Sequence, residues 1–291
     1  MKFGIMTMQL GALIPSGASP QNAMAQIAQF DLSSLVRQLA SHGFNPIELG
    51  GDLVMFMPHT FAPQSIEKLS ALKKELGLTY TVHLPLWSVE PSTPLTPVRQ
   101  GSLRAVIDMI RATQSLDPAA YVLHPYGALA SEFYRMNIPD SARALILQVF
   151  QNAARDSVKT ILAETGIASR KLAVETIEFP LEHLLALANE FDTSICFDTG
   201  HVLAGFAGDI DFWDALEQCL PRISHVHLHD CPAYTRTRKL GYGQDHQPLG
   251  KGDLDVGRFL NRLKAANFAG TIMFELTVAE ALASMHAVKN F

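Results

Sequence analysis

The sequence predicts an α/β fold, a (β/α)8 TIM barrel that occupies residues 1–291 as a single domain. Three observations predict this fold. Short apolar runs alternate eight times with longer segments of helical period, no glycine-rich linker divides the chain, and 291 residues suffice for one barrel. Strands that alternate with helices form parallel β-α-β units, and a barrel of such units takes roughly 250 residues.

Eight short apolar runs are the predicted strands. They comprise residues 2–7, 46–49, 80–84, 120–124, 172–175, 194–198, 223–228 and 271–276. The first run stands beside a single lysine and has no small-residue cleavage site after it, so we expect a strand there and not a signal peptide. No glycine-rich dinucleotide fingerprint follows this strand, which disfavours an open doubly wound sheet.

The segments between these runs have the apolar spacing of helices. The predicted helices comprise residues 32–41, 63–76, 99–113, 141–165, 181–191, 212–220, 256–266 and 278–288. The long connection 231–252 after the seventh strand is the candidate lid. It carries Arg236, Arg238 and Lys239 among glycines and prolines, so we expect it to close over an anionic part of a substrate and to bring His246 toward the site.

Composition restricts the possible classes of protein. Apolar residues make up 48% of the chain and charged residues 18%, which is typical of a globular protein. No stretch reaches the ~20 apolar residues of a membrane span, and three cysteines form no paired framework, so a cytoplasmic protein is expected. The net charge of −5 argues weakly against a nucleic-acid partner.

Histidines and carboxylates gather at the ends of the predicted strands. The histidines are His83, His124, His201, His225, His227, His229 and His246, and the carboxylates are Glu48, Glu175, Asp198 and Glu275. The carboxyl ends of barrel strands meet on one face, so these side chains are expected to share one cavity. Imidazole and carboxylate together suit Zn²⁺, Mn²⁺ or Fe²⁺.

Each of these residues also has an ordinary structural interpretation. A single strand-end histidine is more often a hydrogen-bonded structural residue, Glu48 could pair with a nearby cation, and Asp198 could cap the turn that leads to His201. The recurrence at six consecutive strand ends weakens this interpretation, because so many like charges in one cavity are costly without a cation. His225, two residues before His227 on the same strand face, is expected to pack or to support a ligand.

Longer motifs carry a family resemblance over nearly the whole chain. They are HLP at 83–85, YVLHPYG at 121–127, VET at 174–176, CFDTGH at 196–201, VHLHD at 226–230, DHQPLGKGDLD at 245–255 and FEL at 274–276. In this order they resemble the xylose-isomerase-like, endonuclease IV-like (AP endonuclease family 2) TIM-barrel superfamily. The stretches 78–86 and 115–124 are also similar to the cobamide-remodelling phosphodiesterases of that superfamily.

The resemblance implies one to three divalent metal ions and a ligand set. In the endonuclease branch, the positions of His83, His124 and Glu175 bind a first metal, those of Glu175, Asp198, His227 and Glu275 bind a second, and those of His201 and His246 belong to a third. Gln244 stands where that pattern has an aspartate, so either Asp245 substitutes for it or the third site is weak or empty. The resemblance leaves His229 at a variable position, and we expect it not to contact a metal.

Two enzyme functions and one binding function fit these residues. We favour a phosphodiester hydrolase on a small phosphorylated substrate, with Arg236, Arg238 and Lys239 as phosphate-binding residues. The alternative is a sugar or sugar-phosphate isomerase or epimerase, in which Glu175 and Glu275 flank the substrate as acid and base. A binding protein with a vestigial metal is the third possibility. DNA as a substrate is disfavoured, because no basic stripe is visible.

Overall fold

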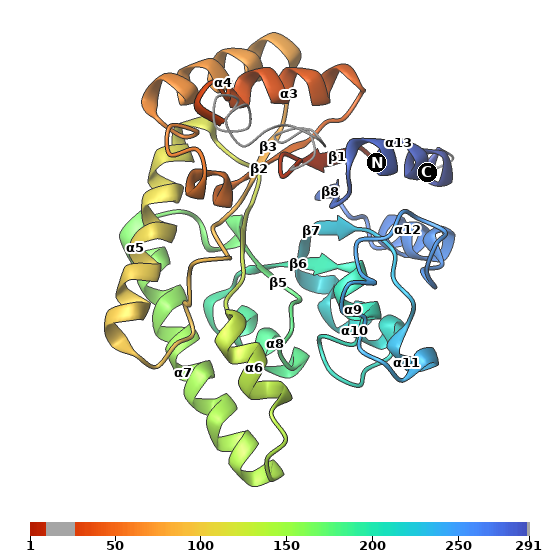
Figure 1. Cartoon of the computed structure of the whole chain (residues 1–291). Coiled ribbons are helices and arrows are strands. Elements are labelled where there is room, and N and C mark those ends of the chain that lie inside the picture. Colours follow the sequence, from red (N-terminus) through yellow and green to blue (C-terminus); the bar gives the residue numbers. More distant parts are fainter. Residues whose placement is uncertain (10–26, 290–291) are drawn as a thin grey trace.

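Eight parallel strands close into a barrel in the order of the chain, as the sequence predicts (Figure 1). The structure is a computed structural model and describes residues 1–9 and 27–289. The strands are β1 (Phe3–Met6), β2 (Ile47–Gly50), β3 (Tyr80–His83), β4 (Tyr121–Leu123), β5 (Leu172–Glu175), β6 (Ser194–Asp198), β7 (Ile223–Leu228) and β8 (Thr271–Phe274). Pairing of β1 with β8 completes the ring.

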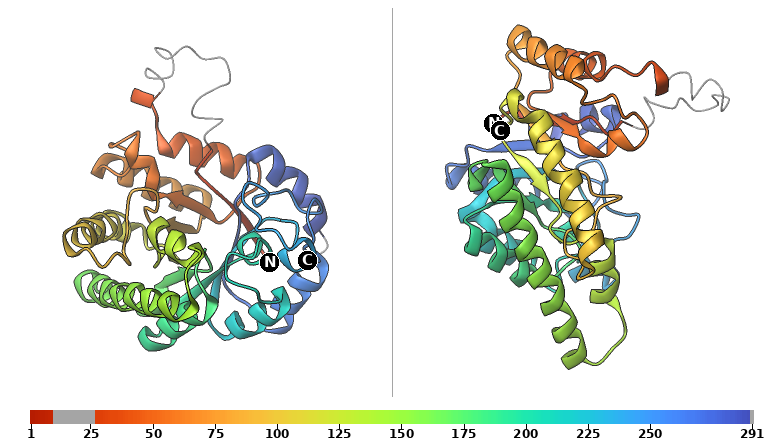
Figure 2. Two further views of the ribbon diagram at one scale, coloured as in Figure 1. Left: turned by 60° about the horizontal axis from the view of Figure 1, so that its bottom comes forward. Right: turned by 90° about the vertical axis from the view of Figure 1, so that its left-hand side faces the viewer.

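Helices surround this ring (Figure 2, left). They are α3 (Leu32–Ser41), α4 (Pro63–Leu76), α5 (Thr96–Thr113), α6 (Ala128–Arg135), α7 (Asp140–Thr165), α8 (Leu181–Phe191), α9 (Thr199–Leu203), α10 (Phe212–Cys219), α11 (Tyr234–Thr237), α12 (Val256–Ala265) and α13 (Val278–Val288). The eight predicted helices are present, and α6, α9 and α11 lie in segments where no helix is predicted. Among the described residues no helix combines the length and the apolar character that a membrane span requires.

Polar side chains fix where several helices begin. Asp31, Asp211 and Asp255 accept backbone N–H groups in the first turns of α3, α10 and α12. Thr277 and Glu280 form a reciprocal capping box at the start of α13. Such caps satisfy N–H groups that have no partner within the helix and stabilise it by about 1 kcal/mol each.

The strand residues alternate between the outer core and the barrel interior. The side chains on the outer face belong to the main apolar core under the helices; they include Val82, Val174, Phe197, Val226 and Phe274. The interior side chains form two levels. The lower level comprises Thr81, Val122, Ala173, Cys196, His225 and Met273, all buried. Two residues further along the same strands, the upper level comprises His83, His124, Glu175, Asp198, His227 and Glu275.

Candidate metal centre

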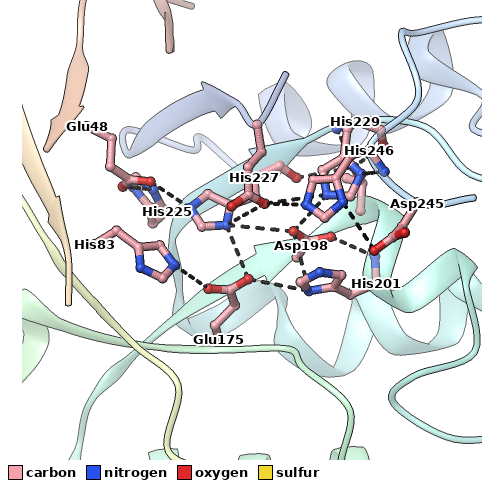
Figure 3. A network of polar contacts seen from close by, with 12 residues as sticks. Glu48, His83, Glu175, Asp198, His201, His225, His227, His229, Asp245 and His246 are labelled. Atoms are coloured by element: carbon pink, nitrogen blue, oxygen red, sulfur yellow. Dashed lines mark hydrogen bonds and ion pairs between the residues drawn. The ribbon is translucent and has the colours of Figure 1, made fainter. Parts of the chain in front are cut away.

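The eight predicted metal-binding residues meet at one end of the barrel. Figure 3 labels six of them, namely His83, Glu175, Asp198, His201, His227 and His246. The ligand atoms of the eight form overlapping groups, each with its atoms within 4.8 Å of one another. Three of these groups contain all eight residues together with His229: a first of His83, His124 and Glu175; a second of Glu175, Asp198, His227 and Glu275; and a third of His201, His229, His246 and Glu275. The structure thus brings together side chains from six strand ends and from the lid, as the convergence of parallel strands predicts.

Glu175 lies at the centre of the cluster and turns one oxygen toward each of two groups. Its Oε2 is 2.9 Å from His124 Nε2 and 3.3 Å from His83 Nε2, and these three buried atoms have no hydrogen-bond partner of regular geometry. Its Oε1 is 3.2 Å from His227 Nδ1 and 3.4 Å from His201 Nδ1. Buried polar atoms without partners are costly, and a cation between them would satisfy all of them.

The second group surrounds the Nδ1 atom of His227. This nitrogen is 3.6 Å from Asp198 Oδ2 and 3.5 Å from Glu275 Oε2, in addition to Glu175. Parallel pairing of β6 with β7 aligns Asp198 with His227 and so fixes their separation. Burial would raise the pKa of Glu275, but the nearby His227 and the hydrogen bond from His246 outweigh it and lower this pKa to about 2. These carboxylates are therefore ionised, as a divalent cation requires.

Glu48 supports His227 from the side opposite the cluster. It accepts hydrogen bonds from His227 Nε2 at 3.0 Å, from the Thr81 hydroxyl at 2.8 Å, and it is 2.8 Å from His225 Nε2. Burial would raise the pKa of Glu48, but the two imidazoles outweigh it and hold this pKa well below its usual range. The nearby cation that the sequence allows for Glu48 is thus the imidazole of His227, whose pKa burial would lower but the surrounding carboxylates raise. A carboxylate on the far nitrogen of a histidine fixes which nitrogen can bind a metal, here Nδ1.

The lid contributes His246 to the third group and places Asp245 beside it. His246 Nε2 is 3.2 Å from Glu275 Oε2, and its Nδ1 is 3.1 Å from the carboxylate of Asp245. Gln244 is exposed, and its amide donates to the carbonyl of the adjacent Gly243. Of the two candidates that the sequence leaves open for the missing acid, Asp245 is the one whose side chain reaches His246.

Two of the three lid cations pair with aspartates at the surface, and the binding of a substrate by the three stays a prediction. Arg236 donates to Asp253 at 2.7 Å and Arg238 pairs with Asp209 at 3.2 Å, both at the molecular surface. Lys239 is exposed. Figure 1 shows the short helix α11, which carries Arg236, at the outer edge of the molecule. The lid is bent so that its C-terminal part, which includes Tyr242, Asp245 and His246, faces the site. The order of charged residues in the sequence does not show which part of the lid does so.

Two adjoining cavities of about 390 and 350 Å³ open above the cluster and share Trp87, His124 and His201 in their walls. Glu275 lines the larger one, whereas Glu175 lines neither. Among the described residues no lysine or arginine lines either cavity. Any charge that would bind an anionic substrate here must therefore come from the histidines or from bound cations.

Sequence reasoning missed the residues that shape the cavity wall. Trp87 is 51% exposed and stands between the two cavities. Asp52, buried in the wall, accepts the backbone N–H groups of Leu86 and Trp87 and so fixes this loop. Tyr242 of the lid covers the smaller cavity. No motif marks these residues, because their role depends on the path of three separate loops.

A family model described as a xylose isomerase-like TIM barrel matches residues 36–289. Among curated proteins, the uncharacterized protein MJ1311 of Methanocaldococcus jannaschii is 25% identical over 266 residues, which cover 89% of this chain and 84% of that protein.

Solved structures show a similar fold over the full length. A D-tagatose 3-epimerase-like protein has a TM-score of 0.70 at 22% identity and covers 100% of this chain and 96% of its own. Endonuclease IV from Thermus thermophilus has a TM-score of 0.63 at 18% identity, with 100% and 98% covered. The 3-keto-D-glucoside 4-epimerase of E. coli has a TM-score of 0.67 at 17% identity and covers both chains fully. At these identities the likeness concerns the fold.

Proposed function

The chain belongs to the xylose isomerase-like TIM-barrel family, and from that premise we propose that it is a metal-dependent hydrolase of small-molecule phosphodiesters. Solved structures of similar fold include endonuclease IV and, in greater number, sugar epimerases, so the fold by itself does not favour a hydrolase. The choice depends on how this chain arranges its own donor atoms around the two glutamates.

The observation that carries the proposal is the division of Glu175 between two groups of donors. Oε2 faces His83 and His124, and Oε1 faces His227 and His201. A carboxylate in this position can bridge two cations. Two ions a few ångströms apart suit the in-line displacement at phosphorus, since both the attacking and the leaving oxygen need stabilisation.

The accessible glutamate of the cluster also supports hydrolysis. Glu175 is fully buried, so its role is to hold cations and keep the surrounding imidazoles in place. The side chain of Glu275 is 12% exposed and faces the larger cavity, and its low pKa keeps it ionised. Glu275 is therefore the glutamate of the cluster that can contact a substrate or an attacking water in this cavity. Divalent cations on these donors, Zn²⁺, Mn²⁺ or Fe²⁺, would supply the positive charge that a phosphate needs.

The cavity walls favour a small substrate over a nucleic acid. Cavities of about 390 and 350 Å³ hold a molecule of modest size. Binding to DNA depends on lysines and arginines that track many phosphates, and neither cavity wall carries one among the described residues. A small substrate with one phosphodiester, bound by the metal cluster itself, needs no such row of lysines and arginines.

The test measures bound metal and hydrolysis together. After loading with Zn²⁺ or Mn²⁺, the protein is expected to retain about two or three ions per chain and to cleave bis(p-nitrophenyl) phosphate. Glu175→Gln should lose at least one ion and the hydrolysis, while Glu75→Gln, at an exposed carboxylate on α4, serves as the control. Retention of a single ion by the unaltered protein, with no cleavage of any diester tested, would refute the proposal.

A sugar isomerase or epimerase is the second candidate, and cavity walls without a lysine or arginine among the described residues favour it. A neutral sugar needs no cationic partner, and one ion on Glu175, Asp198, His227 and Glu275 could hold two vicinal oxygens. The inaccessible Glu175 argues against it, because an acid and a base would have to reach the sugar from both sides. Incorporation of deuterium from solvent into a carbon-bound position of a ketose would support isomerisation in place of hydrolysis.

A further inference from the structure

His229 lies between the lid and the metal-binding carboxylates without facing the cavities. It follows β7 directly, is fully buried, and its backbone N–H donates to the hydroxyl of Thr199 at 3.1 Å. Its Nε2 is 2.9 Å from Asp198 Oδ2. Its Nδ1 accepts the backbone N–H of His246 at 2.9 Å. The two ring nitrogens thus contact two different parts of the site.

The identity of these partners fixes the tautomer of the ring. A backbone N–H can only donate, so the Nδ1 atom of His229 must carry a lone pair. An ionised carboxylate can only accept, so Nε2 must carry the hydrogen that it donates to Asp198. Both requirements are met by the neutral imidazole with hydrogen on Nε2, and by no other form.

The same reasoning excludes His229 as a ligand, although its ring lies near His201, His246 and Glu275. Coordination through Nε2 would move the hydrogen to Nδ1, where it would meet the N–H of His246. Coordination through Nδ1 would take away the acceptor of that N–H group. Either change leaves a buried donor without a partner.

Packing holds the ring in this orientation. The imidazoles of His229 and His246 are stacked, with centroids 4.2 Å apart and planes at 10°. A Cβ atom at Gly200 would lie 2.1 Å from the Nδ1 and Cε1 atoms of His229, so only glycine leaves room for the ring. Directly after His246, the lid is tied to the segment that follows β7 by the paired backbone bonds between Asp230 and Gln247.

We propose that His229 is a positioning residue, neutral and hydrogen-bearing at Nε2, which holds Asp198 with one nitrogen and the lid at His246 with the other. The inference rests on the proposed metal site but not on the reaction catalysed there. His229 would keep Asp198 from turning away from its cation and would hold His246 over the third group of donors. One ring thereby couples the order of the lid to the metal-binding carboxylate.

The tautomer is measured first, on the metal-free full chain. Long-range ¹H–¹⁵N spectra of the histidine-labelled protein, assigned by comparison with His229→Asn, should show hydrogen on Nε2 of His229 and a lone pair on Nδ1. This pattern should persist when Zn²⁺ alone is added. Hydrogen on Nδ1 of His229, or a Zn²⁺-induced shift of either of its ring nitrogens like that of His227 Nδ1, would overturn the proposal whatever the enzyme's reaction.

Two variants then separate the two ends of the ring. His229→Asn keeps an acceptor near the Nδ1 position and loses the contact with Asp198, so Zn²⁺ affinity should fall about 10–100-fold while the lid stays ordered. His229→Gln keeps a donor near the Nε2 position, so Zn²⁺ affinity should stay within a few-fold while the amide of His246 exchanges with deuterium about tenfold faster. His42→Asn, at an exposed histidine, is the control.

The contrast between the variants decides the outcome. If both variants lose Zn²⁺ affinity equally with no change in exchange at the lid, His229 is a ligand and the proposal is wrong. If neither property changes in either variant, the two hydrogen bonds have no positioning effect and the proposal is also wrong. Both measurements use the metal-free or Zn²⁺-loaded protein, so they remain valid if no diester is hydrolysed.

Discussion

Replacing Glu48 by glutamine should weaken metal binding although Glu48 itself contacts no proposed metal. This buried carboxylate accepts from the Thr81 hydroxyl with one oxygen and from His227 Nε2 with the other, and His225 Nε2 lies 2.8 Å from it. A glutamine amide carries no charge and offers one oxygen and one NH₂ group. With the NH₂ group toward His227, two donors meet; with the oxygen toward His227, the NH₂ group replaces the acceptor beside Thr81 and His225.

The cost follows from these contacts. Loss of one charge-assisted hydrogen bond costs about 2 kcal/mol, and a buried donor left without an acceptor costs about 1 kcal/mol more. The metal-free Glu48→Gln protein should therefore be less stable by about 3 kcal/mol, a fall of roughly 6–12 °C in melting temperature. Because His227 loses its support, Zn²⁺ affinity should drop about 10–100-fold.

Thermal melting of the metal-free protein and calorimetric titration with Zn²⁺ measure the two effects separately. Thr81→Val is the matched control, since it removes a donor to Glu48 but leaves the contacts of the carboxylate with both imidazoles. If Glu48→Gln melted and bound Zn²⁺ like the unaltered protein, Glu48 would not be what fixes His227, and the assignment of Nδ1 as its metal-facing atom would have to be abandoned.

Three further predictions concern other parts of the molecule. Gly200→Ala should lower the free energy of unfolding by about 1–3 kcal/mol in urea titrations, because a Cβ would collide with the ring of His229; an unchanged midpoint would mean that the ring can move. The double change Arg236→Ala and Arg238→Ala should leave KM for a phosphorylated substrate within about twofold, since both side chains pair with surface aspartates, and a selective rise in KM would support the prediction from the sequence that they bind the substrate. Burial raises the pKa of Asp31, but serine hydroxyls and a lysine outweigh it and lower this pKa to about 2, so its contribution to stability is complete above pH 3.8 and is lost as pH falls toward 2. Asp31→Asn should therefore lose less stability than the unaltered protein over that range in acid-unfolding experiments, and parallel curves would contradict this.

Much of the barrel could be predicted because its signals are local. The bounds of β5, β6 and β7 match the predicted runs, since each run is flanked by residues that leave the sheet. Helix α5 begins at Thr96, earlier than predicted, with a proline in its first turn. Helix α6 was missed because Gly127 at its start makes no side-chain cap that a pattern could reveal.

The cluster of donors was predictable for a related reason, whereas its surroundings were not. Parallel strands of similar length must bring His83, Glu175 and Glu275 to one end, so sequence position alone implies proximity. The partners of Glu48 depend on pairing between strands distant in the chain. The direction in which Arg236 points depends on how the lid folds back. A lid with Arg236 at the site and a lid with Arg236 at the surface have the same sequence of charges, so the sequence does not distinguish them.

The distribution of the donors along the chain has a consequence for assembly. His83 comes from the third strand and Glu275 from the end of the last, and β1 must pair with β8 before the ring is closed. No partly folded intermediate that lacks the final strand can offer the complete set of ligands. Cation binding would therefore select finished barrels over incomplete ones, and it would stabilise them in proportion to the logarithm of the free cation concentration. A cell short of the metal would then accumulate chains that leave the closed ring more readily.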